Sequence, residues 1–206
     1  MTPPPSALLD RAGYLAVRRH ADGVFDLASR LPDQVFRTAP TAPADTLFGD
    51  FDTALTPGFW PVLQAMARWH GDDLIHLLVI RPDTETYYLP EYGMYPAVSL
   101  PVGAGEDDYR AVIEYEPNDD FAGALAISAE VIAITGPSGR WGCWAERDPE
   151  VAVFRGFPDQ AAKHAWCSRF GPFIDASGAL EDYLEPVFRG SVPVEYAARL
   201  TANYGG

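Results

Sequence analysis

The feature that most constrains the fold is a short, continuous apolar run near the middle of the chain. Residues 74–80 read Leu-Ile-His-Leu-Leu-Val-Ile, and a turn-forming Arg-Pro-Asp-Thr cluster follows at residues 81–84. Such a run is too short for a typical buried helix and has little polar character, which is typical of a strand covered on both faces. The sequence therefore predicts a central strand at residues 74–80.

An amphipathic helix is predicted directly before this strand. Thr56 can cap its start, Pro57 suits the first helical position, and Gly71 suits its end. Its large side chains recur at spacings of three and four residues, as the buried side of a helix requires. They are Phe59, Trp60, Leu63, Met66, Ala67 and His70.

A β-hairpin is predicted around Asp148 and Pro149. Two strand-like segments, residues 140–147 and 150–155, flank this turn-forming pair. Successive side chains of a strand point to opposite faces, so the first segment divides its residues between two faces. Trp141, Cys143 and Ala145 fall on one face, and Trp144 and Glu146 fall on the other.

Three further segments have strand-like sequences: residues 87–89, residues 96–102, and the alternating residues 109–116. The N-terminal region allows two interpretations. An Asp-Gly pair at residues 22–23 favours a hairpin over residues 14–28, whereas residues 6–19 can also form a helix capped by Ser6. We expect the hairpin. Residues 31–52 contain three prolines and no sustained periodicity, which predicts a long connection.

The remaining segments are predicted to be helical. A helix over residues 121–132 follows the capping residues 118–120, and three more occupy residues 158–170, 177–189 (capped by Ser177) and 193–200. No repeat or linker divides the chain. We therefore expect one α+β domain over residues 1–206, with an antiparallel or mixed sheet, helices on one face and a C-terminal helical section. Residues 1–6 are expected to form a flexible tail.

The charge of the chain limits its partners. It has 15 Lys and Arg against 29 Asp and Glu, a formal net charge of −14. Such a surface repels nucleic-acid phosphates and anionic lipids and attracts basic proteins, so we expect no nucleic acid and no membrane as a partner. No apolar run is long enough for a membrane span and the N-terminus lacks signal-peptide features, which favours a soluble, cytoplasmic protein. Acidity that merely maintains solubility is the other interpretation.

Motifs for cofactors or metals are missing from the sequence. Residues 136–139 lack the order and the lysine of a phosphate-binding loop, and Cys143 and Cys167 fit neither a disulfide framework nor a zinc site. The acidic and histidine side chains within residues 70–76 match no metal-ligand spacing. We therefore expect no cofactor and no metal, and a non-catalytic role is favoured.

An enzyme stays open as the alternative: a small hydrolase or transferase that uses carboxylates or Cys143 in a pocket assembled by the fold. Cys143 lies in a strand close to tryptophans and should be buried and unreactive. The alternative requires that at least two of six side chains converge in a deep pocket. These are His76, Glu114, Cys143, Glu146, Asp148 and His164.

Two groups of residues are candidates for a partner-binding surface. Tyrosines combine apolar area with a polar tip, which suits a protein interface. The alternatives are a small core beneath a loop for the first group and a local ion pair for the second. The first group is Tyr87, Tyr88, Glu91, Tyr92 and Tyr95; the second, at the hairpin tip, is Trp144, Glu146, Arg147 and Asp148.

Residues 138–148 carry the pattern Ser-Gly-x-Trp-Gly-x-x-x-Glu-Arg-Asp, and residues 59–63 read Phe-Trp-Pro-x-Leu. On these residues the chain resembles small uncharacterised bacterial proteins, among them proteins of the toxin-immunity kind. Immunity proteins are commonly acidic binders that block the active site of a toxin, and the resemblance implies such a role here. The expectation is a non-catalytic, cytoplasmic bacterial protein that neutralises a basic protein partner through an acidic, aromatic face.

Overall fold

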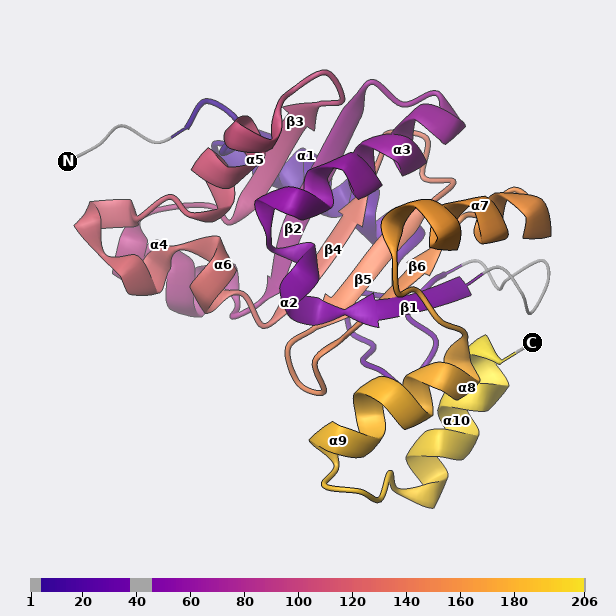
Figure 1. Ribbon diagram of the computed structural model, residues 1–206. Coiled ribbons are helices and arrows are strands. Elements are labelled where there is room, and N and C mark those ends of the chain that lie inside the picture. The colour runs from indigo at the N-terminus through magenta and orange to yellow at the C-terminus, as the bar shows by residue number, and fades with distance from the viewer. Residues whose placement is uncertain (1–4, 38–45, 206) are drawn as a thin grey trace.

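The centre of the protein is a six-stranded antiparallel sheet with the strand order β1-β6-β5-β4-β2-β3 (Figure 1). The computed structural model describes residues 5–37 and 46–205. The predicted central strand is confirmed, because β2 pairs with β3 on one side and with β4 on the other. The strands are β1 (Thr46–Asp50), β2 (Leu74–Arg81), β3 (Ala97–Pro101), β4 (Val131–Thr135), β5 (Gly142–Glu146) and β6 (Val151–Arg155).

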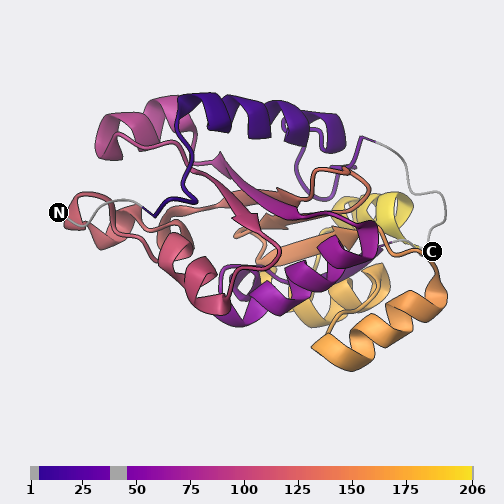
Figure 2. The same cartoon turned by 90° about the horizontal axis from the view of Figure 1, so that it is seen from above.

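Helices lie on both faces of the sheet, as the view from above shows (Figure 2). One face is covered by α3 (Trp60–His70), α5 (Glu106–Ile113) and α7 (Gln160–Phe170). The other face is covered by α1 (Arg11–Val24), α8 (Ala176–Ala179) and α10 (Val194–Tyr204). The α+β class, the antiparallel sheet and the C-terminal helical section are confirmed. The prediction that helices cover only one face is wrong, because α1 buries its apolar side on the opposite face.

Short helical segments connect these elements. Most of them lie where the chain leaves or enters a strand, so they position the residues considered below. They are α2 (Phe51–Ala54), η2 (Pro57–Phe59), η3 (Thr84–Tyr88), α4 (Leu89–Tyr92), η4 (Pro117–Asp119), η5 (Phe121–Gly123), α6 (Leu125–Ser128), η6 (Leu180–Leu184) and α9 (Glu185–Val187).

The predicted hairpin of β5 and β6 is confirmed, with its turn at Asp148 and Pro149. Every residue of β5 is buried. Cys143 and Ala145 belong to the core beneath α3, α5 and α7, whereas Trp144 belongs to the core beneath α1 and α10. The predicted division of this strand between two faces is therefore correct.

The predicted N-terminal hairpin is wrong, since α1 runs through the Asp-Gly pair at residues 22–23. Asp10, not Ser6, caps this helix by accepting a hydrogen bond from the backbone N–H of Gly13 at 2.9 Å. The residues that α1 buries are Tyr14, Val17 and Ala21, at spacings of three and four. This helical period outweighs the local turn preference of Asp-Gly because it buries an apolar stripe on the sheet.

The strand predicted at residues 109–116 is wrong, because residues 109–113 belong to the helix α5. In α5 the buried residues are Tyr109, Val112 and Ile113, again at helical spacing. The polar residues between them give this segment an alternating pattern that also fits a strand. The helix predicted over residues 121–132 is replaced by η5, α6 and the start of β4. The strand predicted at residues 87–89 is replaced by η3 and α4, while the one at residues 96–102 is confirmed as β3.

The predicted end of α3 is confirmed, whereas two predicted N-terminal caps are wrong. α3 ends at Gly71, whose φ of 74° is a left-handed conformation that favours glycine. Thr56 precedes η2 and makes no side-chain cap; its hydroxyl donates to the carbonyl of Thr53 at 2.8 Å instead. Asp175 rather than Ser177 caps α8. β1 occupies part of the predicted long connection, whose residues 38–45 lie outside the described residues, as do residues 1–4 of the predicted tail.

Among the described residues, no helix combines the length and the apolar character that crossing a membrane requires.

Two glycines provide a test of this fold. A Cβ at Gly142 would lie 2.5 Å from the ring of Phe25, which is buried, so Gly142→Ala is expected to lower the free energy of unfolding by about 1–3 kcal/mol. A Cβ at Gly23 meets no atom within 4 Å. Gly23→Ala in α1 is expected to raise the free energy of unfolding by about 0.5–1 kcal/mol. Urea unfolding of both variants measures these changes, and a loss of stability in Gly23→Ala would contradict the helix.

Candidate functional site

Antiparallel pairing brings the two predicted groups of residues to the same end of the sheet. Arg81 at the end of β2 pairs with Val131, and Glu146 at the end of β5 pairs with both Val131 and Val151. The segments that follow β2 (η3 and α4) therefore lie at the same end as the turn between β5 and β6. In Figure 1 this end carries α2, α4 and α6.

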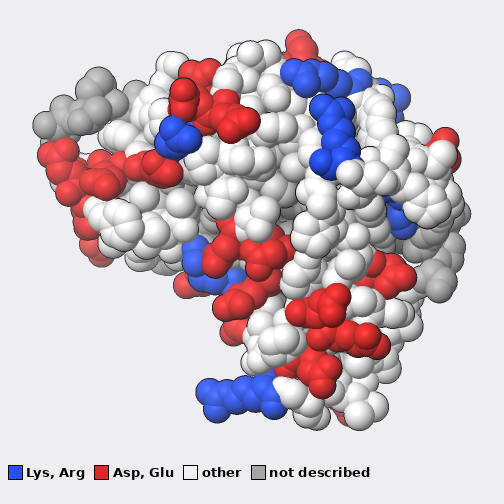
Figure 3. Space-filling view, viewed as in Figure 1, with Lys and Arg blue, Asp and Glu red and all other residues white. Residues whose placement is uncertain are grey.

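Carboxylates are concentrated at this end, which we call the acidic end. Figure 3 shows them in red from the left tip of the molecule across its lower middle, while a group of basic side chains lies at the upper right. They come from the ends of β1 and β2, from the chain between α5 and β4, and from the β5–β6 turn. They are Asp50, Asp52, Asp83, Glu85, Glu91, Glu116, Asp119, Asp120, Glu130, Asp148 and Glu150.

Arg147 lies among these carboxylates but serves the fold. Its guanidinium donates to the carbonyl oxygens of Ala129 at 2.9 Å and Ala126 at 3.0 Å, and its Nη1 lies 3.5 Å from Asp52. These contacts tie the β5–β6 turn to α6 and α2. The neighbouring Asp148 is exposed at the tip of the turn. Arg147 is therefore a structural link, and Asp148 is exposed to solvent at the tip.

The predicted tyrosines form a cluster that reaches from the core to the surface. The side chain of Tyr88 is fully buried, and its hydroxyl lies 2.8 Å from Oγ of Ser128. The ring of Tyr87 stands edge-on to those of Tyr88 and Tyr92, with centroids 5.1 and 5.7 Å away. The hydroxyl contact with Tyr87, then partial burial and the nearby Asp120 and Glu91, raise the pKa of Tyr92 to about 12. Tyr92 therefore keeps its proton at neutral pH.

Tyr92 and Tyr95 line a mostly apolar groove of about 490 Å³, which we call the tyrosine groove. The ring of Tyr95 also packs against Tyr14 at 5.3 Å, which holds one wall of the groove on α1. Glu91, adjacent to Tyr92, is exposed. The groove is lined by Leu8, Leu9, Asp10, Arg11, Tyr92, Gly93, Met94, Tyr95, Tyr115, Pro117 and Asn118.

Two large apolar side chains are exposed in the segment that follows the groove residues Pro117 and Asn118. Phe121 in η5 is 61% exposed and Ile127 in α6 is 45% exposed. Both lie in the chain between α5 and β4, which also carries Asp119 and Asp120. The acidic end therefore combines exposed apolar side chains with carboxylates around them.

Trp144 and Glu146 are not part of this surface, since their exposed fractions are 0% and 3%. One carboxylate oxygen of Glu146 accepts hydrogen bonds from the indole N–H of Trp144 at 2.6 Å and from the backbone N–H of Leu31 at 2.9 Å. Burial raises the pKa of Glu146, an effect that the two hydrogen bonds and the nearby Arg30 and Arg81 oppose. Glu146 holds the loop at Leu31 against β5.

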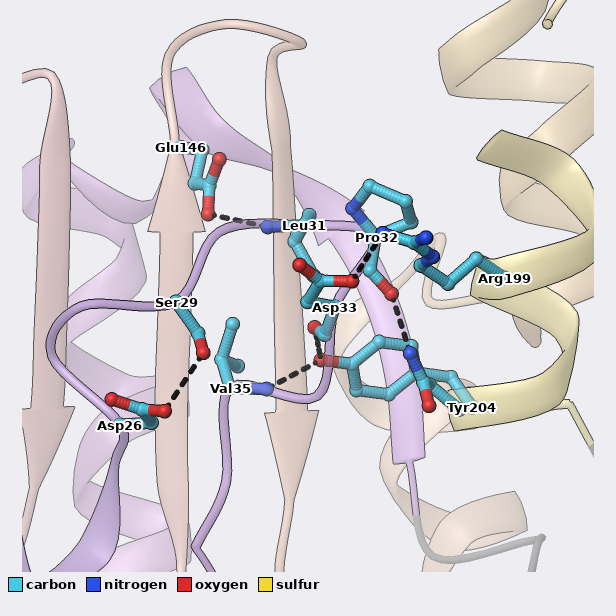
Figure 4. Close-up of polar contacts among 10 residues, drawn as sticks. Asp26, Ser29, Leu31, Pro32, Asp33, Val35, Glu146, Arg199 and Tyr204 are labelled. Atoms are coloured by element: carbon cyan, nitrogen blue, oxygen red, sulfur yellow. Dashed lines mark hydrogen bonds and ion pairs between the residues drawn. The ribbon is translucent and has the colours of Figure 1, made fainter. Parts of the chain in front are cut away.

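The same loop is held by α10, as Figure 4 shows. The hydroxyl of Tyr204 donates to the carbonyl of Asp33 at 2.6 Å and accepts from the backbone N–H of Val35 at 2.9 Å. Arg199 pairs with the carboxylate of Asp33 at 2.9 Å. Residues 26–36 are therefore fixed between the sheet and the C-terminal helix, and Glu146 forms the sheet side of this connection.

At the opposite end of the sheet, Asp72 makes a connection that the sequence did not indicate. Its carboxylate accepts from the indole N–H of Trp141 at 2.8 Å and from the hydroxyl and backbone N–H of Ser138 at 2.8 and 2.7 Å.

The nearby His76 also has a partner within the protein. Its Nδ1 forms a hydrogen bond with the hydroxyl of Ser99 at 3.0 Å, and burial and the nearby His20 lower the pKa of His76. In the described part of the chain, no group of three metal-ligating side chains is placed to hold an ion.

The enzyme alternative requires a pocket in which two of the six named side chains converge. Five cavities formed by the described residues, 5–37 and 46–205, do not meet this requirement. None of them is lined by two of the six side chains named for that alternative. Cys143 is fully buried, and burial raises the pKa of its thiol well above the ordinary value. The thiol is therefore protonated and out of reach of a substrate.

Comparison of the chain with protein-family models, with curated proteins and with solved structures finds no match to any of them.

The buried carboxylate yields a prediction with a defined pH dependence. Because the folded-state pKa of Glu146 is raised above 4.5, its contribution to stability is fully present below the unfolded pKa and is lost as the pH rises through the folded pKa. Glu146→Gln keeps an acceptor oxygen without the charge. Glutamine does not titrate, so the variant keeps its stability where the wild type loses the contribution of Glu146. The free energy of unfolding of the variant minus that of the wild type is therefore expected to increase from about pH 4 to about pH 7.

Glu146→Ala is the matched comparison, because it leaves the N–H groups of Trp144 and Leu31 buried without an acceptor. It is expected to cost about 2–4 kcal/mol at both pH values. Urea unfolding at the two pH values measures both variants. A glutamine variant whose relative stability falls as the pH rises would show that the charged form is favoured in the folded protein.

Proposed function

We propose that this protein is a non-catalytic binding protein that recognises a basic protein partner at its acidic end. The observation that carries the proposal is the combination found there: the tyrosine groove and the exposed Phe121 and Ile127, surrounded by carboxylates. Protein interfaces commonly have an apolar centre inside a polar rim. An acidic rim selects a partner whose own rim is basic.

Charge supports the same partner. The chain has a formal net charge of −14, and carboxylates of the acidic end belong to segments far apart in the sequence that the sheet brings together. A field of one sign over one end of a protein raises the rate at which an oppositely charged partner arrives in the correct orientation. Arg147 does not neutralise this field fully, since it is shared between backbone carbonyls and Asp52.

The tyrosines supply the short-range contacts in this proposal. Tyr92 stays neutral, so its hydroxyl can both donate and accept hydrogen bonds while its ring covers apolar surface. Tyr95 is held on α1 by its contact with Tyr14. Because these side chains are already ordered, less conformational entropy is lost when a partner binds.

The resemblance to immunity-type proteins is compatible with this site. The hairpin that carries the pattern, β5 and β6, has its tip at Asp148 within the acidic end. In our proposal the partner is therefore a basic toxin. No cavity that we describe favours the hydrolase or transferase alternative, and we do not propose it.

Charge reversal at the acidic end tests the proposal. A tagged protein should capture a basic partner in a stoichiometric complex at low salt. The triple variant Glu85→Lys, Glu91→Lys, Asp148→Lys is expected to weaken the purified complex by about tenfold or more, because it replaces attraction by repulsion at exposed positions. Titration calorimetry at low and high salt measures the affinity and its salt dependence.

The control places the same three charge reversals at the opposite end of the sheet. Asp73, Glu106 and Asp107 are exposed and lie before β2 and after β3, away from the acidic end. Their replacement by lysine gives the same net charge and should leave the affinity within about threefold of the wild type at high salt. Equal losses in the two variants, or no stoichiometric complex at low salt, would contradict the proposed function.

A further inference from the structure

A small slot opens beside the end of β1, next to the carboxylates of the acidic end. Its volume is about 140 Å³. Phe59 and Val62, from η2 and α3, are buried and form its floor, while Thr53, Gly58 and Pro172 are exposed at its rim. The slot therefore has an apolar interior with access from solvent.

Aromatic rings form much of the wall of this slot. Phe173 lies directly over Gly49, where an added Cβ would come within 3.0 Å of its ring. The same ring packs edge-on against Phe154 at 5.3 Å, which fixes its position. Phe170 and Tyr183 complete the wall. Aromatic faces carry partial negative charge and attract cations within about 6 Å.

Asp50 places a carboxylate in the same slot. Its Oδ1 accepts from the backbone N–H of Thr53 at 2.8 Å and from the Thr53 hydroxyl at 3.1 Å, and no described residue donates to Oδ2. The pKa of Tyr183 is raised, first by burial and then by the charges of Asp50 and Asp182. The slot is therefore lined by a carboxylate with one oxygen that no described donor occupies.

The size of the slot limits what it can hold. A cavity of about 150 Å³ accommodates one benzene molecule. A slot of about 140 Å³ thus takes about six heavy atoms, the number in an arginine side chain beyond Cβ. A guanidinium group stacks on aromatic rings and donates two parallel hydrogen bonds to a carboxylate, whereas a lysine ammonium is a more strongly hydrated point charge.

We propose that this slot binds an arginine side chain of the basic partner, which makes it the anchoring site of the interface. The inference rests on the proposed function, since it names the partner residue that the acidic end recognises. The guanidinium lies against Phe173 and Tyr183 and pairs with Asp50, and the aliphatic stem covers the apolar floor at Phe59.

The slot can be tested on the isolated protein with a small probe, n-propylguanidinium, and its neutral isostere n-propylurea. Nuclear magnetic resonance should show saturable binding of propylguanidinium, with intermolecular contacts to the rings of Phe59 and Phe173. Propylurea is expected to bind about tenfold more weakly, because it lacks the positive charge that pairs with Asp50 and is attracted to the aromatic rings. Equal affinity for the two probes would overturn the proposal.

Asp50→Asn and Asp52→Asn form a matched pair of variants. Asparagine at position 50 can still accept from Thr53 and cap α2, so it removes the charge while the local structure is kept. Asp50→Asn should lower the affinity for propylguanidinium about tenfold, to the level of propylurea. Asp52 is exposed and does not line the slot, so Asp52→Asn should change that affinity by less than about twofold. An unchanged affinity in Asp50→Asn would overturn the proposal.

The two proposals fail in different ways. Probe binding that depends on Asp50, with no basic partner captured, would refute the proposed function and support a cation-binding slot. A partner complex that is sensitive to the acidic-end charge reversals, with no probe bound at the slot, would refute the arginine anchor alone.

Discussion

The burial of β5 on both of its faces is the constraint on which the rest of the structure depends. A strand whose residues are all withdrawn from water needs a complete layer on each side. On one side the layer is built from α3, α5 and α7 around Cys143 and Ala145. On the other side Trp144 belongs to the core beneath α1 and α10, where its ring packs against Phe25 and its indole N–H donates to Glu146. The two layers explain why the chain forms helices before, between and after its strands.

The antiparallel topology then decides where polar residues gather. Because neighbouring strands run in opposite directions, the end of β2, the start of β4 and the turn after β5 all lie at one end of the sheet. The short helical segments there carry carboxylates, tyrosines and exposed apolar side chains from four separate parts of the sequence. In our proposal this end is the partner-binding surface, whereas the opposite end carries internal connections such as that of Asp72 with Ser138 and Trp141.

Local sequence signals succeeded where a single element determines its own structure. The β5–β6 hairpin, β2 and α3 follow from alternation, from a short apolar run and from helical spacing that ends at a left-handed glycine. They failed for α1 and α5, whose buried residues are interrupted by polar ones in a way that also fits a strand. The choice between the two periods depends on which one places an apolar stripe on the sheet, and that surface does not exist until the sheet is formed.

The sequence by itself determined the acidic charge, the alternation along β5 and the clustering of tyrosines at residues 87–95, because each depends only on residue types and short spacings. The tertiary structure alone decided that Tyr92, Tyr95 and Asp148 reach the surface whereas Tyr88, Trp144 and Glu146 do not. It also assembled the slot at Asp50 from residues 49–62 and 170–183. Burial and pocket formation depend on contacts between segments distant in the chain, and those contacts follow from packing of the complete sheet rather than from local preference.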